Sequence, residues 1–143
     1  MATYNKFDTF VYHLGLGYHV LGTHKLTLYL SNAAPSNTAD VWKVDCAEIT
    51  AANGYNNTNT CDMNWTQSTN VCTLAANNDV TWTATAGNFG PFRYVVLYND
   101  NATDGNNVDG LIAWWDYGSA INCNNGESFT VDFPANKVVA TLT

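Results

Sequence analysis

The stretch Phe89-Gly-Pro-Phe-Arg-Tyr-Val-Val-Leu-Tyr-Asn-Asp100, continued after a polar loop by Gly110-Leu-Ile-Ala-Trp-Trp-Asp-Tyr-Gly118, decides the fold. Both halves carry aromatic and aliphatic residues at successive positions, whereas Asn, Asp and Gly fill the segment between them. Runs that are apolar on both alternating faces are typical of strands buried on both sides. The pattern therefore predicts a hairpin of two antiparallel strands at the centre of the core.

The register of this hairpin can be predicted from its charges. Arg93 is the only arginine and lies inside the first predicted strand, where an unpaired buried charge would be costly. If Asn99 lies opposite Gly110, antiparallel pairing brings Arg93 across from Asp116. We therefore predict contact between these two side chains, and their placement on opposite faces of the sheet would contradict the register.

Shorter strand patterns continue this alternation along the chain. Between Asp79 and Thr85, one side holds Val80, Trp82 and Ala84 and the other holds threonines, which predicts a strand with an apolar inner face. Further strands are expected at residues 24–31, with leucines on one half-buried face, and at 127–133 and 138–143. Weaker strand patterns occur at residues 41–44, 61–66 and 70–74.

Two segments depart from the strand pattern. Near the N-terminus, Phe7, Phe10, Val11 and Leu14 recur at helical spacing after Asn5 as an N-cap, so a short helix is expected, although Val11 and Tyr12 also favour a strand and the glycines at 15 and 17 would end a helix soon after. Residues 48–60 have turn composition and are expected to form a surface excursion with almost no core content. Together the patterns predict one all-β domain over residues 1–143, a single-domain β-sandwich, with a jelly roll as its favoured form and at most one short N-terminal helix.

Composition limits the kinds of partner that the chain is expected to bind. The 143 residues include 12 acidic and 5 basic side chains, for a net charge of −7. Because the basic residues are scattered singly, we expect no nucleic-acid partner. The N-terminus lacks a secretory pattern and no stretch reaches membrane-spanning length, so we expect a soluble product of a cytosol with no membrane partner.

The four cysteines, Cys46, Cys61, Cys72 and Cys123, contain no Cys-x-x-Cys pair. In a cytosolic product free thiols are expected. One or two disulfides or a metal site remain open alternatives, and four cysteines allow three pairings that spacing alone cannot distinguish.

Two motifs suggest chemistry at first sight. Residues 99–109 resemble an Asp-x-Asp-x-Asp-Gly calcium loop, but Ala102 stands at the middle ligand position and Leu111 at the closing acidic one, so a solvated hairpin loop is expected. The three histidines, His13, His19 and His24, accompany no Gly-x-Ser-x-Gly elbow, and neither spacing between them matches a His-x3-His pair. We expect them in packing or surface positions, with no catalytic, metal or cofactor site.

The five tryptophans invite a saccharide-binding hypothesis, since exposed aromatic rings can stack on sugars. Trp82 lies on the apolar side of its predicted strand, however, and the adjacent Trp114 and Trp115 must point to opposite faces, so one of them is expected in the core. The outward member could equally lie in a protein interface. Glu48, Asp116 and Glu127 offer no spacing that would pair two carboxylates for glycoside hydrolysis.

Several runs resemble a family of small tailed-bacteriophage virion proteins over nearly the whole chain. The most specific are Gly90-Pro-Phe-Arg-Tyr94 and Trp115-Asp-Tyr-Gly118, supported by runs at residues 4–7, 26–35, 48–55 and 126–133. The pattern is similar to that of capsid decoration (cement) proteins, including the jelly-roll cement protein of a Bordetella phage. The chain departs from it in its cysteines and in the stretch Tyr12-His-Leu-Gly-Leu-Gly-Tyr-His19, where a more polar helix is expected.

The resemblance implies a non-enzymatic virion protein that is made in the host bacterial cytoplasm and binds the outer capsid surface. Its implied partners are the major capsid protein and other copies of itself, as a dimer or trimer. The alternatives are a saccharide-binding adhesion module of a head or tail fibre, and a tail-tube or tail-completion component. The candidate interface residues are Arg93, Trp114, Asp116 and Tyr117.

Overall fold

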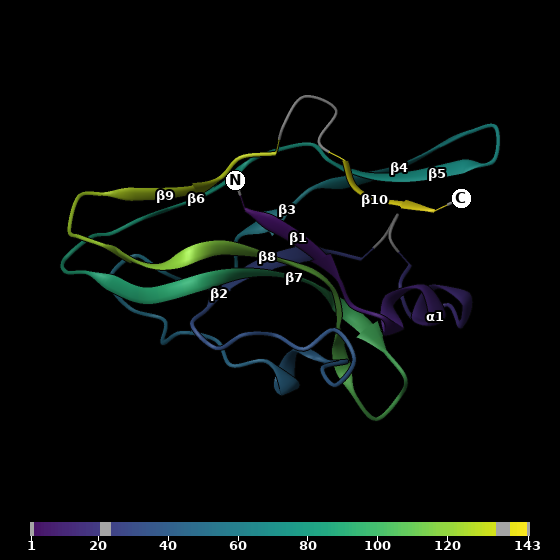
Figure 1. The fold of residues 1–143 in the computed structure, drawn as a ribbon, viewed down its shortest axis with the longest axis horizontal. Helices are drawn as coiled ribbons and strands as arrows, with labels where there is room; N and C mark the ends of the chain where they lie inside the picture. Colours follow the sequence, from purple (N-terminus) through teal and green to yellow (C-terminus); the bar gives the residue numbers. More distant parts are fainter. Residues whose placement is uncertain (1, 21–23, 134–137, 143) are drawn as a thin grey trace.

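The structure is a computed structural model that describes residues 2–20, 24–133 and 138–142. It is an all-β protein of two packed layers with one short helix, as predicted (Figure 1). The first layer is a five-stranded antiparallel sheet in the order β1 (Thr3–Lys6), β8 (Val108–Cys123), β7 (Phe89–Thr103), β2 (Leu26–Ser31) and β3 (Thr60–Cys61). The jelly-roll form stays a prediction.

The central hairpin is confirmed. Its strands β7 and β8 pair antiparallel with Asn99 opposite Gly110, as expected. Past Ile112 the register shifts by one residue, so that Tyr94 rather than Arg93 lies opposite Asp116. The predicted contact forms nonetheless, because Nε and Nη2 of Arg93 donate to the two Asp116 carboxylate oxygens at 2.7 and 2.8 Å.

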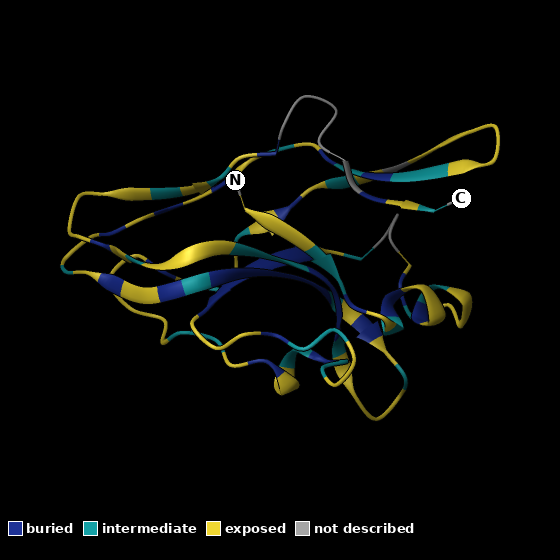
Figure 2. Cartoon of the chain, in the orientation of Figure 1, coloured by how far each residue is buried: buried dark blue, intermediate teal, exposed yellow. Residues whose placement is uncertain are grey.

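The middle of the hairpin, residues 94–99 of β7 and 110–113 of β8, is buried on both faces because each face has its own cover, whereas residues 114–122 of β8 are half-buried or exposed (Figure 2). One face packs against the second layer through residues such as Val95 and Leu97. On the other face, Val96 and Tyr98 form a smaller cluster with Tyr29 and with Cys46, which lies in the loop between β2 and β3. This loop therefore completes the core instead of only connecting strands.

The second layer consists of a three-stranded and a two-stranded sheet. The strands are β4 (Met63–Ser68), β5 (Val71–Ala76) and β10 (Val138–Leu142) in one sheet, and β6 (Val80–Thr83) and β9 (Ser128–Val131) in the other. Since β6 follows β5 along the chain and β10 follows β9, the two pairings β5–β10 and β6–β9 form one interrupted antiparallel ribbon. Residues 60–68 connect the layers, because β3 pairs with β2 and the adjacent β4 pairs with β5.

Several local predictions were wrong. The N-terminal segment forms β1 before helix α1 (Thr9–Gly15), which begins after Asp8 rather than Asn5, and Val11 is exposed. Strand β2 is buried along its whole length rather than on one face, because β7 and β3 flank it and clusters cover both sides.

The segments between β2 and β3 also differ from expectation. Residues 41–44 form only a single bridge, from Trp42 to Gly110, before the 3₁₀ turn η1 (Lys43–Asp45). The predicted surface excursion at residues 48–60 places Tyr55 in the core at 3% exposure. Its hydroxyl donates to Glu48 at 2.8 Å and accepts from the Leu30 amide at 3.0 Å, so a residue of the loop is tied to a central strand. Within the described residues, no helix has the length and hydropathy needed to span a membrane.

Candidate functional site

The sandwich is closed on one side and open on the other. Residues 60–68 bridge the layers at the β3–β4 side. On the other side, a groove of about 750 Å³ lies between β1 and the edge of the ribbon that β9 and β10 form. Its walls are mainly apolar and aromatic, formed by Tyr4, Trp115, Tyr117, Phe129, Val131 and Phe133. We call this groove the seam.

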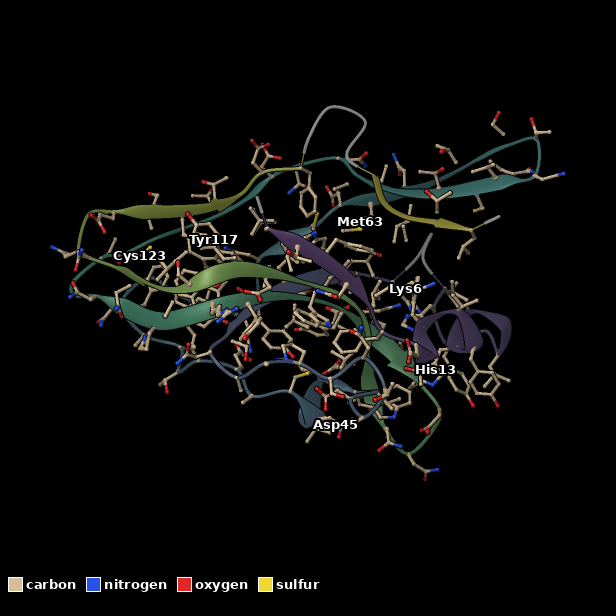
Figure 3. All side chains as sticks on the ribbon, in the orientation of Figure 1. Lys6, His13, Asp45, Met63, Tyr117 and Cys123 are labelled. Atoms are coloured by element: carbon tan, nitrogen blue, oxygen red, sulfur yellow. The ribbon has the colours of Figure 1, made fainter. Side chains whose placement is uncertain are left out.

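Ring contacts fix the walls of the seam. Tyr4 on β1 packs on Trp115 at 5.7 Å between ring centroids, and Trp115 contacts Phe133 at 5.9 Å. Toward the other end, Tyr117 meets Phe129 edge-on at 6.4 Å. Figure 3 shows Tyr117 on the β9 side of β8 and Lys6 at the far end of β1, so these two residues lie toward opposite ends of the seam.

The backbone edges of the seam are defined by the hydrogen-bond ladders. The Phe7 amide donates to the Ile112 carbonyl, and bonded pairs alternate in an antiparallel ladder, so Thr3 and Asn5 point their backbone groups toward β8. The N–H and C=O groups of Tyr4 and Lys6 consequently point away from β8, toward the seam. Within the described chain, β1 pairs with β8 alone, and β9 pairs with β6 alone.

The predicted interface residues are split between two surfaces. Arg93, Trp114 and Asp116 lie on the outer face of the five-stranded sheet, where Trp114 packs edge-on against Tyr94 and donates to Asn37 Oδ1 at 2.7 Å. The Asp116 carboxylate holds the pKa of Arg93 above its usual value, and the guanidinium lowers the pKa of Asp116. Tyr117, 53% exposed, lies instead in the seam wall.

The tryptophans offer little exposed ring surface. Trp82 is buried as predicted, at 1% exposure, and Trp42 is buried at 8%. Trp114 and Trp115 point to opposite faces of β8, as predicted, but both are half-buried rather than one being fully in the core. The side chain of Trp65 lies outside the described residues. Among the side chains that the structure describes, no indole forms an exposed platform for a sugar.

The histidines lie in packing positions, where buried His13 and His19 and half-buried His24 form one cluster. The Asn99 side-chain amide lies 3.2 Å from Nδ1 of His19 and 3.1 Å from Nδ1 of His24, and the His19 ring lies so close to Gly110 that a Cβ there would come within 2.9 Å of it. Burial, with smaller contributions from His13 and His24, lowers the pKa of His19 to about 4. The His19 ring is therefore neutral at neutral pH, which suits a structural cluster.

The hairpin loop is ordered by its own hydrogen bonds, and three of the four cysteines are buried. Asp104 accepts hydrogen bonds from the Asn106 and Asn107 amides at 2.8 and 2.7 Å, and these bonds lower its pKa and order the hairpin tip. Across the described ranges, no group of three potential ligands is placed to hold a metal ion. Cys46 and Cys123 are buried free thiols and Cys72 is a half-buried one, whereas the Cys61 thiol donates to the Asn78 carbonyl at 3.5 Å.

Thiol reactivity follows from this burial. Burial and the neighbouring Asp40 raise the pKa of Cys46 to about 12, so almost none of it is the reactive thiolate near neutral pH. We expect a thiol reagent at mildly alkaline pH to modify Cys72 first and Cys46 last, as measured by peptide mass mapping over time. Early modification of Cys46 in the folded protein would contradict the packing around Asp40.

A smaller hollow lies over the cluster that Tyr29, Cys46, Val96 and Tyr98 form on the outer face of the five-stranded sheet. Lys43 bonds Glu48 at 3.1 Å and stands 4.9 Å above the Tyr98 ring, and Asn57 donates to the same carboxylate at 3.2 Å. With Tyr55 also donating to Glu48, three side chains bind this carboxylate. These contacts tie the loop between β2 and β3 to itself and, through Tyr98, to β7.

Comparisons with family models, curated proteins and solved structures found no match. The seam is thus the site that the geometry itself singles out. Sequence reasoning identified only one of its residues, Tyr117, as a surface candidate. Phe129, Val131 and Phe133 alternate with polar residues along the strand expected at residues 127–133, but the strand order leaves the apolar face that they share open, and local patterning does not encode that order.

Proposed function

We propose that this chain is a non-catalytic virion protein that binds the outer surface of a phage capsid and stabilises the head. The observation that carries the proposal is the seam, an apolar groove of about 750 Å³ walled by aromatic side chains. Exposed apolar patches of this kind mark binding sites, and tyrosine and tryptophan are enriched in protein interfaces.

The resemblance to capsid decoration proteins supports the same reading. The segments that carry it most specifically, Gly90–Tyr94 and Trp115–Gly118, lie in β7 and β8, which build the core and one wall of the seam. The low content of charged residues suits contacts made through packing and neutral hydrogen bonds, which salt weakens less than ion pairs. The major capsid protein is the proposed partner, with copies of the chain grouped as dimers or trimers around local symmetry axes.

Titration of purified protein onto undecorated heads tests the proposal. We expect saturable binding at a fixed copy number per capsomer, measured by co-sedimentation. Two exposed tyrosines form a matched pair: Tyr117 in the seam is 53% exposed and Tyr12 on α1 is 65% exposed. Tyr117→Ser should weaken binding about tenfold, the effect of losing one interface anchor, whereas Tyr12→Ser should bind like wild type.

The other candidate functions give different results in this assay. Binding to glycans without binding to heads would contradict the proposal and favour an adhesion module. Equal binding by the two serine variants would contradict the docking surface while leaving a capsid partner in place.

A further inference from the structure

The seam has the geometry of a sandwich that lacks one strand. We propose that it binds an extended segment of the partner protein, which enters as an additional antiparallel strand between β1 and the ribbon edge formed by β9 and β10. The inference rests on the proposed function only for the identity of that partner, the capsid shell. The binding mode itself follows from the two strand edges that face the opening.

The size of the seam fits a single strand. One residue of an extended chain occupies about 160 Å³ of a sheet, from a rise of about 3.4 Å, a strand spacing of about 4.8 Å and a layer thickness of about 10 Å. A groove of about 750 Å³ therefore accommodates about five residues. This length matches the bordering strands, since β1 and β9 have four residues each.

The directions of the bordering strands favour one antiparallel occupant. Tyr117 contacts Phe129, and Trp115 contacts Phe133, so β9 and the segment after it run opposite to β8. Since β1 is also antiparallel to β8, β1 and β9 run in the same direction, as Figure 1 shows. A strand that is antiparallel to β1 is then antiparallel to β9 as well, which is the more stable pairing on both sides.

Backbone groups on both edges are oriented to receive such a strand. Tyr4 and Lys6 point their N–H and C=O groups away from β8. On β9, the Ala84 amide donates to the Glu127 carbonyl, and the alternation that follows makes Ser128 and Thr130 point their backbone groups away from β6. An open edge of this kind is a template for strand addition.

Side chains and charge define the chemistry of the segment. Alternate side chains that point inward meet Trp115, Phe129 and Val131, so they should be apolar. The wall of the seam holds one acidic residue, Asp132, and one basic residue, Lys6, but the whole chain carries a net charge of −7, which favours a segment with basic flanks. The same net charge disfavours a second copy of this chain as the occupant, because two chains of net charge −7 repel each other.

Peptide binding by the isolated protein tests the inference. The probe is a peptide of about seven residues, in which valine alternates with threonine and a lysine stands at each end, titrated into isotope-labelled protein and followed by amide NMR shifts. We expect saturable shifts that centre on Tyr4, Lys6 and Thr130. A matched peptide with aspartate at each end should bind more weakly, because the protein is acidic.

Two substitutions of Lys6, an edge residue of β1, separate the contribution of the backbone N–H to peptide binding from that of the side chain. Lys6→Ala removes the charge and keeps the N–H, whereas Lys6→Pro also removes the N–H that points into the seam, at an edge position where proline is tolerated. We expect Lys6→Ala to bind the peptide and Lys6→Pro to bind at least about tenfold more weakly. If Lys6→Pro does not fold, Thr130→Pro against Thr130→Ala makes the same comparison on β9.

Each remaining outcome is decisive. Three results would overturn the inference: no shift with the basic peptide, equal binding by a folded proline variant and its alanine control, or a wild-type dimer that the proline variant abolishes. In the last case a second copy of the chain would fill the seam. Peptide binding without head binding would retain the inference and reject the capsid function. Head binding that is equal for both Lys6 variants would retain the capsid function and reject the strand.

Discussion

Trp82→Ala is expected to destabilise the folded protein by about 3–5 kcal/mol, which is the usual cost of emptying a buried aromatic site. The Trp82 side chain is 1% exposed, lies 5.9 Å from the Tyr55 ring and 6.4 Å from the Phe129 ring, and donates from Nε1 to the Asn56 carbonyl at 2.8 Å. Truncation therefore leaves a cavity between the layers and an unpaired carbonyl. Denaturant unfolding at neutral pH measures the loss.

Two control variants separate these contributions. Trp82→Phe retains most of the ring volume and loses the hydrogen bond, so its stability should fall between those of wild type and the alanine variant. Tyr12→Ala changes an aromatic residue that is 65% exposed on α1 and should stay within about 0.5 kcal/mol of wild type. A Trp82→Ala variant as stable as Tyr12→Ala would show that the two layers do not pack on this residue.

Acidification is expected to remove about 3 kcal/mol of stability through His19. The folded protein holds this ring neutral, with its pKa lowered from about 6.5 to about 4 by burial. The unfolded chain takes up a proton below about pH 6.5 and the folded one does not, so this contribution is complete above about pH 6.5 and is lost progressively down to about pH 4. Unfolding free energies measured across this window give the slope.

The comparison that isolates His19 is wild type against His19→Gln. Lowering of the His13 pKa by burial acts in the same direction, whereas the raised pKa of Asp109 acts oppositely, and both are shared by the two proteins. The difference between the two curves should therefore shrink by about 3 kcal/mol on acidification. Parallel curves would contradict the burial of His19 against Gly110 and Asn99.

Local patterning predicted the strands that are apolar at every position and those in which apolar and polar residues alternate regularly. The hairpin β7–β8 was recognisable because Val95 through Leu97 are apolar at every position, and β6 because Val80 and Trp82 alternate with threonines. The contact between Arg93 and Asp116 was also predictable, since a lone arginine in an apolar strand needs a partner. The one-residue shift past Ile112 was not, because a bulge depends on packing across the sheet.

The errors have a common cause in long-range contacts. Residues 3–6 form a strand because β8 offers an edge to pair with, although their sequence also suits the start of a helix. Tyr55 is buried because its hydroxyl reaches the Leu30 amide, 25 residues away along the chain. The seam itself arises from which strands end up at the edges, and no periodicity within one strand carries that information.

The most direct test of the account is a cryo-electron microscopy map of heads saturated with the protein. The account predicts that the seam faces the shell and that an extended segment of a capsid subunit runs between β1 and β9, antiparallel to both. Docking through the outer face of the five-stranded sheet around Arg93 and Trp114, with the seam open to solvent, would contradict it.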